Sequence, residues 1–97
     1  MTEITKKVAE FASAISLESI PDKAIERTQM FVMDNIGIML RAYHDAESTP
    51  ALLSGAIALG LGNGSSVVIG DSRAFTPPGA ALINGTLAHS LDFDDTH

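Results

Sequence analysis

The stretch N-G-T-L-A-H-S-L-D-F-D-D-T-H, from Asn84 to His97, starts as an apolar helical pattern and ends in a dense run of polar groups. On a helix, four of its residues recur at steps of four, three and four and so share one stripe: Gly85, His89, Asp92 and Thr96. Asp95 lies at the edge of the same stripe. A helix that only packs into a core does not normally carry an imidazole, a carboxylate and a hydroxyl on one line, so the stripe is predicted to be functional.

Helical signals account for most of the chain upstream of this stretch. The first predicted helix follows Thr2, which has the side chain of an N-cap residue. The second runs from Pro21 to about Tyr43 and is apolar over more than one stripe, which predicts packing on more than one side. The third starts with Thr49 as its N-cap and Pro50 at its first position, and it presents a face of small residues.

Glycines predict two further features. Gly37 lies inside the second helix, where close packing against another helix is the usual compensation for a cost of about 1 kcal/mol relative to alanine. The run Gly60–Gly64 ends the third helix. A dinucleotide-binding loop is rejected, because that motif needs a strand before its glycines and a helix after them. Short strands are predicted at Val67–Ile69 and Arg73–Phe75, and a fourth helix is predicted after the cap residue Thr76.

These elements predict an all-α fold, a bundle of about four helices with a short β-hairpin-like excursion near residues 66–76. The length of 97 residues suits one small domain, and the apolar content is mostly aliphatic, as is typical of helix packing. A net charge of −6 with six scattered basic residues argues against nucleic acid as a partner.

Targeting signals are not expected from this sequence. No apolar run reaches the roughly 18–20 residues that span a bilayer, and no apolar segment follows the N-terminus as in a signal peptide. Cysteine is absent, which excludes disulfides and thiolate chemistry. We therefore expect a cytoplasmic protein without a membrane partner.

Three interpretations compete for the terminal cluster. The aspartates and histidines offer ligands for Mg²⁺ or a transition ion, although no EF-hand loop is present. A carboxylate beside an imidazole on a partly buried stripe can instead acquire a pKa near neutrality and abstract a proton next to a carbonyl or carboxylate. In the third interpretation, the aspartates only terminate a helix and His89 makes a structural hydrogen bond.

The run A-A-L-I-N-G-T-L-A-H-S-L-D-F-D-D-T-H, Ala80–His97, resembles the signature of the MmgE/PrpD family. That family includes 2-methylcitrate dehydratases, cis-aconitate decarboxylases and iminodisuccinate epimerases. Pro21, the run Asp34–Gly37 and the run Val68–Gly70 agree with the same pattern, so the resemblance covers nearly the whole chain. It implies that residues 1–97 form a truncated, N-terminal part of a large all-helical domain.

The resemblance also implies roles for named residues. Asp92 and Thr96 match family positions that line the active site and are expected to be catalytic. His89 on the same stripe and Asp95 at its edge are expected to be substrate-binding residues. Members of the family use neither a metal nor an organic cofactor, so none is expected here. The implied substrates are small di- or tricarboxylates. The chain lacks the cationic partners for them, so the expectation is a lyase fragment that is inactive alone.

Two classes of function therefore remain open. One is a lyase, a dehydratase or decarboxylase, of which this chain supplies half of the pocket. The other is a noncatalytic helical module for oligomerisation or partner binding. The apolar surface of the second and fourth helices exceeds what four short helices can cover, so a homodimer is expected. The sequence does not distinguish dehydratase, decarboxylase and epimerase.

Overall fold

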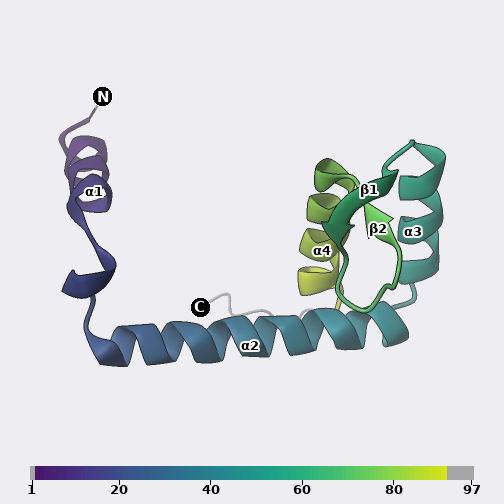
Figure 1. The fold of residues 1–97 in the computed structure, drawn as a ribbon, viewed down its shortest axis with the longest axis horizontal. Coiled ribbons are helices and arrows are strands. Elements are labelled where there is room, and N and C mark those ends of the chain that lie inside the picture. Colours follow the sequence, from purple (N-terminus) through teal and green to yellow (C-terminus); the bar gives the residue numbers. More distant parts are fainter. Residues whose placement is uncertain (1, 92–97) are drawn as a thin grey trace. The chain divides into compact units, whose positions relative to one another are not determined.

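The computed structural model describes residues 2–91 of the chain (Figure 1). In chain order the elements are α1 (Glu3–Ala14), the 3₁₀ turn η1 (Leu17–Ser19), α2 (Asp22–Asp45), α3 (Thr49–Ala58), β1 (Gly62–Val67), β2 (Ala74–Phe75) and α4 (Pro77–Ser90). Across the described range, four α-helices and one two-stranded hairpin confirm the predicted fold class. The chain divides into two compact units, Met1–Phe31 and Val32–His97.

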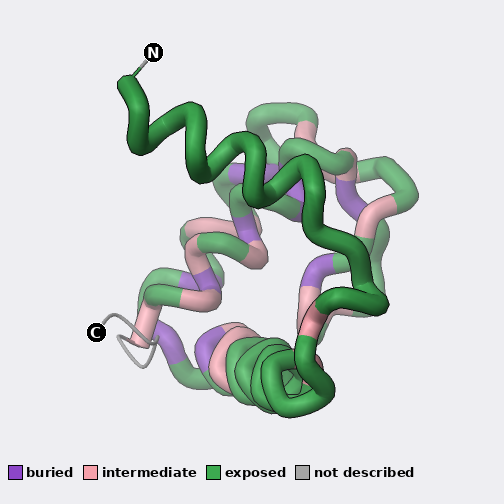
Figure 2. The backbone as a smooth tube through the Cα atoms, turned by 90° about the vertical axis from the view of Figure 1, so that its left-hand side faces the viewer, coloured by how far each residue is buried: buried purple, intermediate pink, exposed green. Residues whose placement is uncertain are grey.

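Local capping defines the elements of the first unit. The Thr2 hydroxyl accepts a hydrogen bond from the Thr5 backbone N–H at 3.2 Å, which confirms the predicted cap of α1. Ser16 and Ser19 form a capping box at η1, in which the Ser16 N–H donates to the Ser19 hydroxyl at 3.1 Å. No residue of α1 is buried, as the uniform green of its tube in Figure 2 shows.

The second helix, α2, is longer than predicted, and other elements cover less of its apolar surface than predicted. It runs to Asp45, and the Pro21 carbonyl accepts from the N–H groups of its first turn, so the proline precedes the helix instead of opening it. The apolar side chains predicted to pack are mostly exposed, among them Val32 and Ile36. Among residues 2–91, a side chain at Gly37 would meet nothing within 4 Å, so within this range the prediction of close helix packing at this glycine is wrong.

The core of the second unit lies where α3, the hairpin and α4 meet the last turns of α2. Its buried apolar residues are Ala42, Ala46, Ala56, Val68, Phe75, Ala80, Ile83 and Leu87. The face predicted for the fourth helix is confirmed, because three of its four residues belong to this core and Leu91 packs against it. The Thr76 hydroxyl accepts from the Gly79 N–H at 3.1 Å and caps α4 as predicted.

The hairpin begins earlier than the sequence pattern predicted. Strand β1 starts at Gly62 and ends at Val67, while Val68 follows it as a fully buried residue. Both Gly62 and Ser66 pair with Phe75, so three residues bulge out between them. The glycine run thus forms strand as well as turn. Gly64 allows the close approach of the Phe75 carbonyl, with which any side chain at this position would collide.

Helix α3 is bounded by one predicted and one unpredicted feature. Gly60, with a φ of +79°, ends it in a Schellman motif: its N–H donates to Ile57 and the Leu61 N–H to Ala56. At the other end, the prediction of Thr49 as N-cap is wrong. Thr49 lies within the helix, is buried, and donates its hydroxyl to the Ala42 carbonyl at 2.7 Å, joining α3 to α2.

Candidate functional site

The predicted stripe is described only in part. Gly85 and His89 are both exposed, one turn apart on α4, and His89 lies in the last turn of that helix. Helix α4 ends at Ser90, with Leu91 at its C-cap. Three of the four predicted site residues, Asp92, Asp95 and Thr96, lie outside the described residues, so their predicted roles stay predictions.

Asn84 is a polar residue of α4 to which the sequence pattern assigned no role. Its Oδ1 accepts from the Ile69 N–H at 2.9 Å, and its Nδ2 donates to the Val67 carbonyl at 2.9 Å. An N–H only donates and a carbonyl only accepts, so the partners define the orientation of the amide. The sequence signal that could have indicated these hydrogen bonds is the position of Asn84 directly after Ile83, a residue of the predicted apolar face that is buried in the structure.

A second polar cluster centres on Asp71, whose side chain is only 2% exposed. Its carboxylate accepts from the Tyr43 hydroxyl at 2.8 Å, from the Arg73 N–H at 2.8 Å, and from Arg73 Nε and Nη2 at 2.9 and 2.7 Å. The hydrogen bonds from the Arg73 side chain do most to hold the pKa of this carboxyl well below its usual range, and burial opposes them.

Tyr43 is a second titratable member of the same cluster. The hydrogen bond to Asp71, followed by burial and the negative charge of that carboxylate, raises the pKa of Tyr43. Tyr43 also meets the ring of His44 edge to face, with ring centroids 5.3 Å apart. A carboxylate with this many donors is charge-balanced and already occupied. Its role is therefore to hold the hairpin loop against α2, not to bind substrate.

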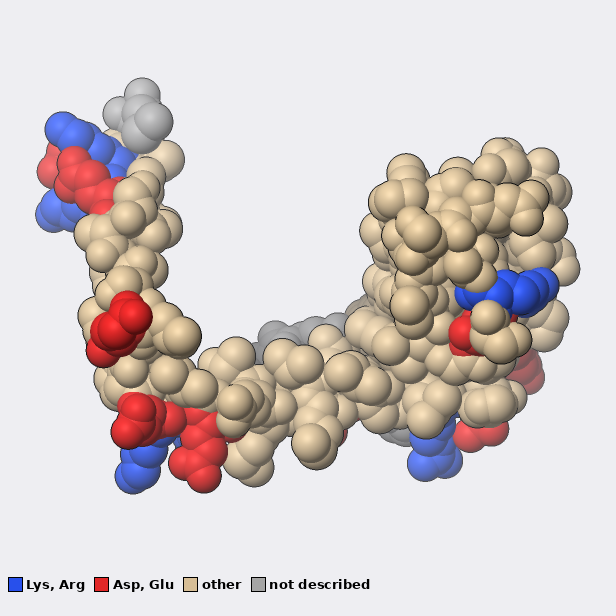
Figure 3. All heavy atoms as spheres, in the orientation of Figure 1, with Lys and Arg blue, Asp and Glu red and all other residues tan. Residues whose placement is uncertain are grey.

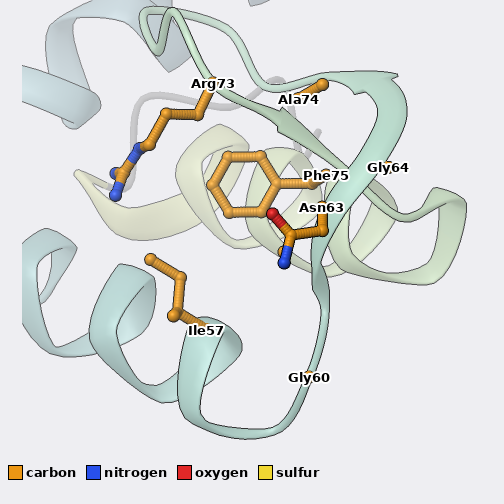
Figure 4. A pocket seen from close by; sticks show the side chains of 8 residues that line it. Ile57, Gly60, Asn63, Gly64, Arg73, Ala74 and Phe75 are labelled. Atoms are coloured by element: carbon orange, nitrogen blue, oxygen red, sulfur yellow. The ribbon is translucent and has the colours of Figure 1, made fainter.

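A cavity of about 450 Å³ opens beside the hairpin. Figure 4 shows its lining residues, which come from α3, the glycine-rich strand β1 and β2 and its preceding turn: Ile57, Gly60, Gly62, Asn63, Gly64, Arg73, Ala74 and Phe75. None of them is a predicted site residue. Among the described residues, Arg73 is the one cationic residue that lines this cavity, and two of its side-chain nitrogens already donate to Asp71, so the cavity is a poor site for a polyanionic substrate.

Residues 2–91 contain neither a cluster of metal ligands nor a membrane-spanning helix. Within that range no three metal-ligating side chains come together, and the acidic segment that raised the metal interpretation lies outside it. Among the same residues, none of the helices combines the length and the apolar character that crossing a bilayer requires.

Comparison with known proteins identifies the class of the chain. The MmgE/PrpD resemblance predicted a mainly helical unit whose last helix leads into an acidic signature. Residues 6–97 match the MmgE/PrpD N-terminal domain, and the chain belongs to this family.

Two curated relatives are cis-aconitate decarboxylases. The chain is 28% identical to that of Homo sapiens and 26% identical to that of Mus musculus, each over 102 aligned positions. Both alignments cover 99% of this chain and 20% of the relative. The chain therefore spans about one fifth of the length of these relatives. No solved structure gives a significant match.

Proposed function

We propose that this chain supplies the N-terminal helical part of a lyase that acts on small di- or tricarboxylates, of the 2-methylcitrate dehydratase or cis-aconitate decarboxylase kind. The observation that carries the proposal is the family match over residues 6–97. The two decarboxylase relatives, each aligned with 99% of the chain, support the same class of substrate.

In this proposal Asp92 takes part in proton transfer and Thr96 hydrogen-bonds the substrate, while His89 and Asp95 help to bind it. In a decarboxylation, the bond between a carboxylate carbon and its neighbour breaks, carbon dioxide leaves, and the remaining electron pair takes a proton. A carboxyl group at the pocket wall can supply that proton. The exposed position of His89 on the last turn of α4 is compatible with a place in such a wall.

Turnover by these 97 residues alone is not expected. The chain carries a net charge of −6, and its signature segment is acidic, so it repels anionic substrates unless cationic groups from elsewhere offset the charge. Incubation of the pure chain with cis-aconitate or 2-methylcitrate should leave both unchanged. Conversion of either substrate by the pure protein would contradict this part of the proposal.

The catalytic roles are tested in a chimaera in which the chain replaces the aligned segment of the human relative. The chimaera should decarboxylate cis-aconitate, and Asp92→Asn should lower kcat on the order of 100-fold or more. His89→Gln should mainly raise KM. A folded, active chimaera in which Asp92→Asn has no effect would remove Asp92 from the mechanism.

A second candidate function is self-association as a homodimer through apolar helix faces. Along α1, Ile4, Val8 and Phe11 are 74%, 62% and 68% exposed. The charged side chains of this helix gather on its other side (Figure 3). Such an amphipathic helix gains free energy when a second surface covers its apolar face.

Light scattering tests the homodimer directly. At micromolar concentration the chain should have twice the monomer mass, and Phe11→Glu should shift it to the monomer. A wild-type chain that stays monomeric across this range would exclude self-association as its function.

A further inference from the structure

Asn84 ties α4 to both sides of a buried loop residue. Its two hydrogen bonds go to the Ile69 N–H and the Val67 carbonyl, which flank Val68, a residue with no exposed surface. One side chain therefore satisfies a backbone donor and a backbone acceptor on either side of a buried residue. Val67 is the last residue of β1 and Ile69 lies in the loop between β1 and β2, so the contact joins α4 to the hairpin.

The same loop is anchored a second time, to α2. The Asp71 N–H donates to the Val68 carbonyl at 3.1 Å and closes the turn, and the Asp71 carboxylate accepts from the Tyr43 hydroxyl. Residues 67–71 thus connect two helices through directional hydrogen bonds. Apolar packing of Ile83 and Leu87 decides which face of α4 is inward, but it resists sliding along the helix axis only weakly, because apolar contact is non-directional.

We infer that Asn84 is a positioning residue, which sets the translation and rotation of α4 and so the placement of His89 in its last turn. This inference rests on the proposed function, since the placement of His89 matters for catalysis only if His89 helps to bind the substrate. Helix α4 ends at Ser90, about 9 Å beyond Asn84 along a rigid helix, so a rotation at the asparagine is transmitted to the last turn.

The decisive variant is Asn84→Asp in the 97-residue chain. At pH 7 its carboxylate still accepts from the Ile69 N–H but faces the Val67 carbonyl without a donor. Loss of one hydrogen bond and the new repulsion should raise the unfolding equilibrium constant on the order of tenfold or more over wild type. Once protonated, the carboxyl regains a donor and mimics the amide, so its pKa in the folded variant lies above the unfolded value.

The ratio of the variant's unfolding constant to that of wild type should therefore fall toward one as the pH drops from about 7 to about 4. The titratable and charged groups of the loop, α2 and α4 are present in both proteins, so their own titration cancels in the ratio: Asp71 and Arg73 of the loop, Tyr43 and His44 of α2, and His89 of α4. Asn84→Ala should show a similar loss at pH 7 without recovery. Leu82→Ala, a half-exposed position on the same helix, should stay within about threefold of wild type at both pH values.

Positioning is read from the backbone amide signals of residues 88–91 in ¹⁵N-labelled chain. They should shift in Asn84→Ala and in Asn84→Asp at pH 7, return to wild-type positions in Asn84→Asp at low pH, and stay in place in Leu82→Ala. A stability loss with unmoved signals would show that Asn84 only stabilises the hairpin, and it would overturn the inference. A ratio of unfolding constants that does not change with pH would overturn it as well. An inactive chimaera would count against the proposed function while leaving these measurements intact.

Discussion

The two units of this chain form helices for different reasons. Among residues 2–31 no residue is buried, and the helices there depend on caps and on their own amphipathic pattern. The unit Val32–His97 encloses a core in which Phe75, Ile83 and Leu87 are at most 1% exposed. The first unit therefore shows what local sequence specifies, and the second shows what tertiary packing adds.

The difference has a thermodynamic consequence. An isolated helix of the length of α1, 12 residues, is marginal in water because nucleation is costly. Its ion pair between Lys6 and Glu10, 4.0 Å apart and exposed, adds only a few tenths of a kcal/mol. Stable helix in the first unit then needs a covering surface, whereas α4 is stabilised by the core that it helps to build.

The largest expected effect comes from matched phenylalanine truncations in the two units. Phe75→Ala removes a ring that is 1% exposed and should cost about 3–5 kcal/mol of unfolding free energy, which is enough to unfold a small domain. Phe11→Ala removes a ring that is 68% exposed and should change it by about 0.5 kcal/mol or less.

Urea denaturation followed by circular dichroism measures both variants. If Phe75→Ala does not fold, Phe75→Leu gives a milder loss from the same site and keeps the comparison measurable. Equal losses at Phe11 and Phe75 would mean that the first unit is covered in solution, which would support the homodimer.

A smaller effect is expected from the polar contact that joins the hairpin loop to α2. Asp71→Ala leaves the Tyr43 hydroxyl and Arg73 without their acceptor and should cost about 1–3 kcal/mol at pH 7. In wild type, the lowered pKa of Asp71 contributes stability that is complete above the unfolded value near 3.9 and is lost as the pH falls through the lower folded value.

The pH profile separates this contact from the core. Wild type should lose more stability below about pH 4 than Asp71→Ala does, so that the two unfolding curves converge in acid. Tyr43 affects the stability at alkaline pH. Its raised pKa stabilises the folded state up to about pH 10, and this stabilisation disappears as the pH rises through the folded value. Parallel curves for wild type and Asp71→Ala would show that the carboxylate is not held as described.

Local signals predicted the helices well. Thr2 and Thr76 were recognised as caps from residue type alone, because a cap depends on atoms within three residues along the chain. The same reasoning failed at Thr49, whose hydroxyl bonds to Ala42, seven residues away on another helix. It failed at β1 because pairing with Phe75, not β-propensity, makes the glycine run a strand.

In the candidate site, too, the residues with local signals were predicted and the residues with distant partners were not. The stripe containing Gly85 and His89 followed from helical spacing, and the family was recognised from the motif that continues it. Asn84 and Asp71 were not recognised as anchors of the hairpin, because the partners of these two hydrogen bonds lie 15 and 28 residues away along the chain. No periodicity in the sequence reports such contacts, and only the folded arrangement of the hairpin against α2 and α4 reveals them.

The smallest expected effect comes from removing one helix cap in each unit. Thr76→Ala deletes the acceptor for the Gly79 N–H and the hydroxyl that donates to the Leu61 carbonyl, and should cost about 1–2 kcal/mol of global stability. Thr2→Ala should fray α1 and reduce helical circular dichroism slightly, while the urea midpoint, which reports the core of the second unit, stays in place. Amide hydrogen exchange resolves the two cases, since the loss should spread over α3, the hairpin and α4 for Thr76→Ala and remain within the first turns of α1 for Thr2→Ala. A shifted midpoint for Thr2→Ala would show that the two units unfold together, and that α1 is coupled to a core to which it contributes no buried residue.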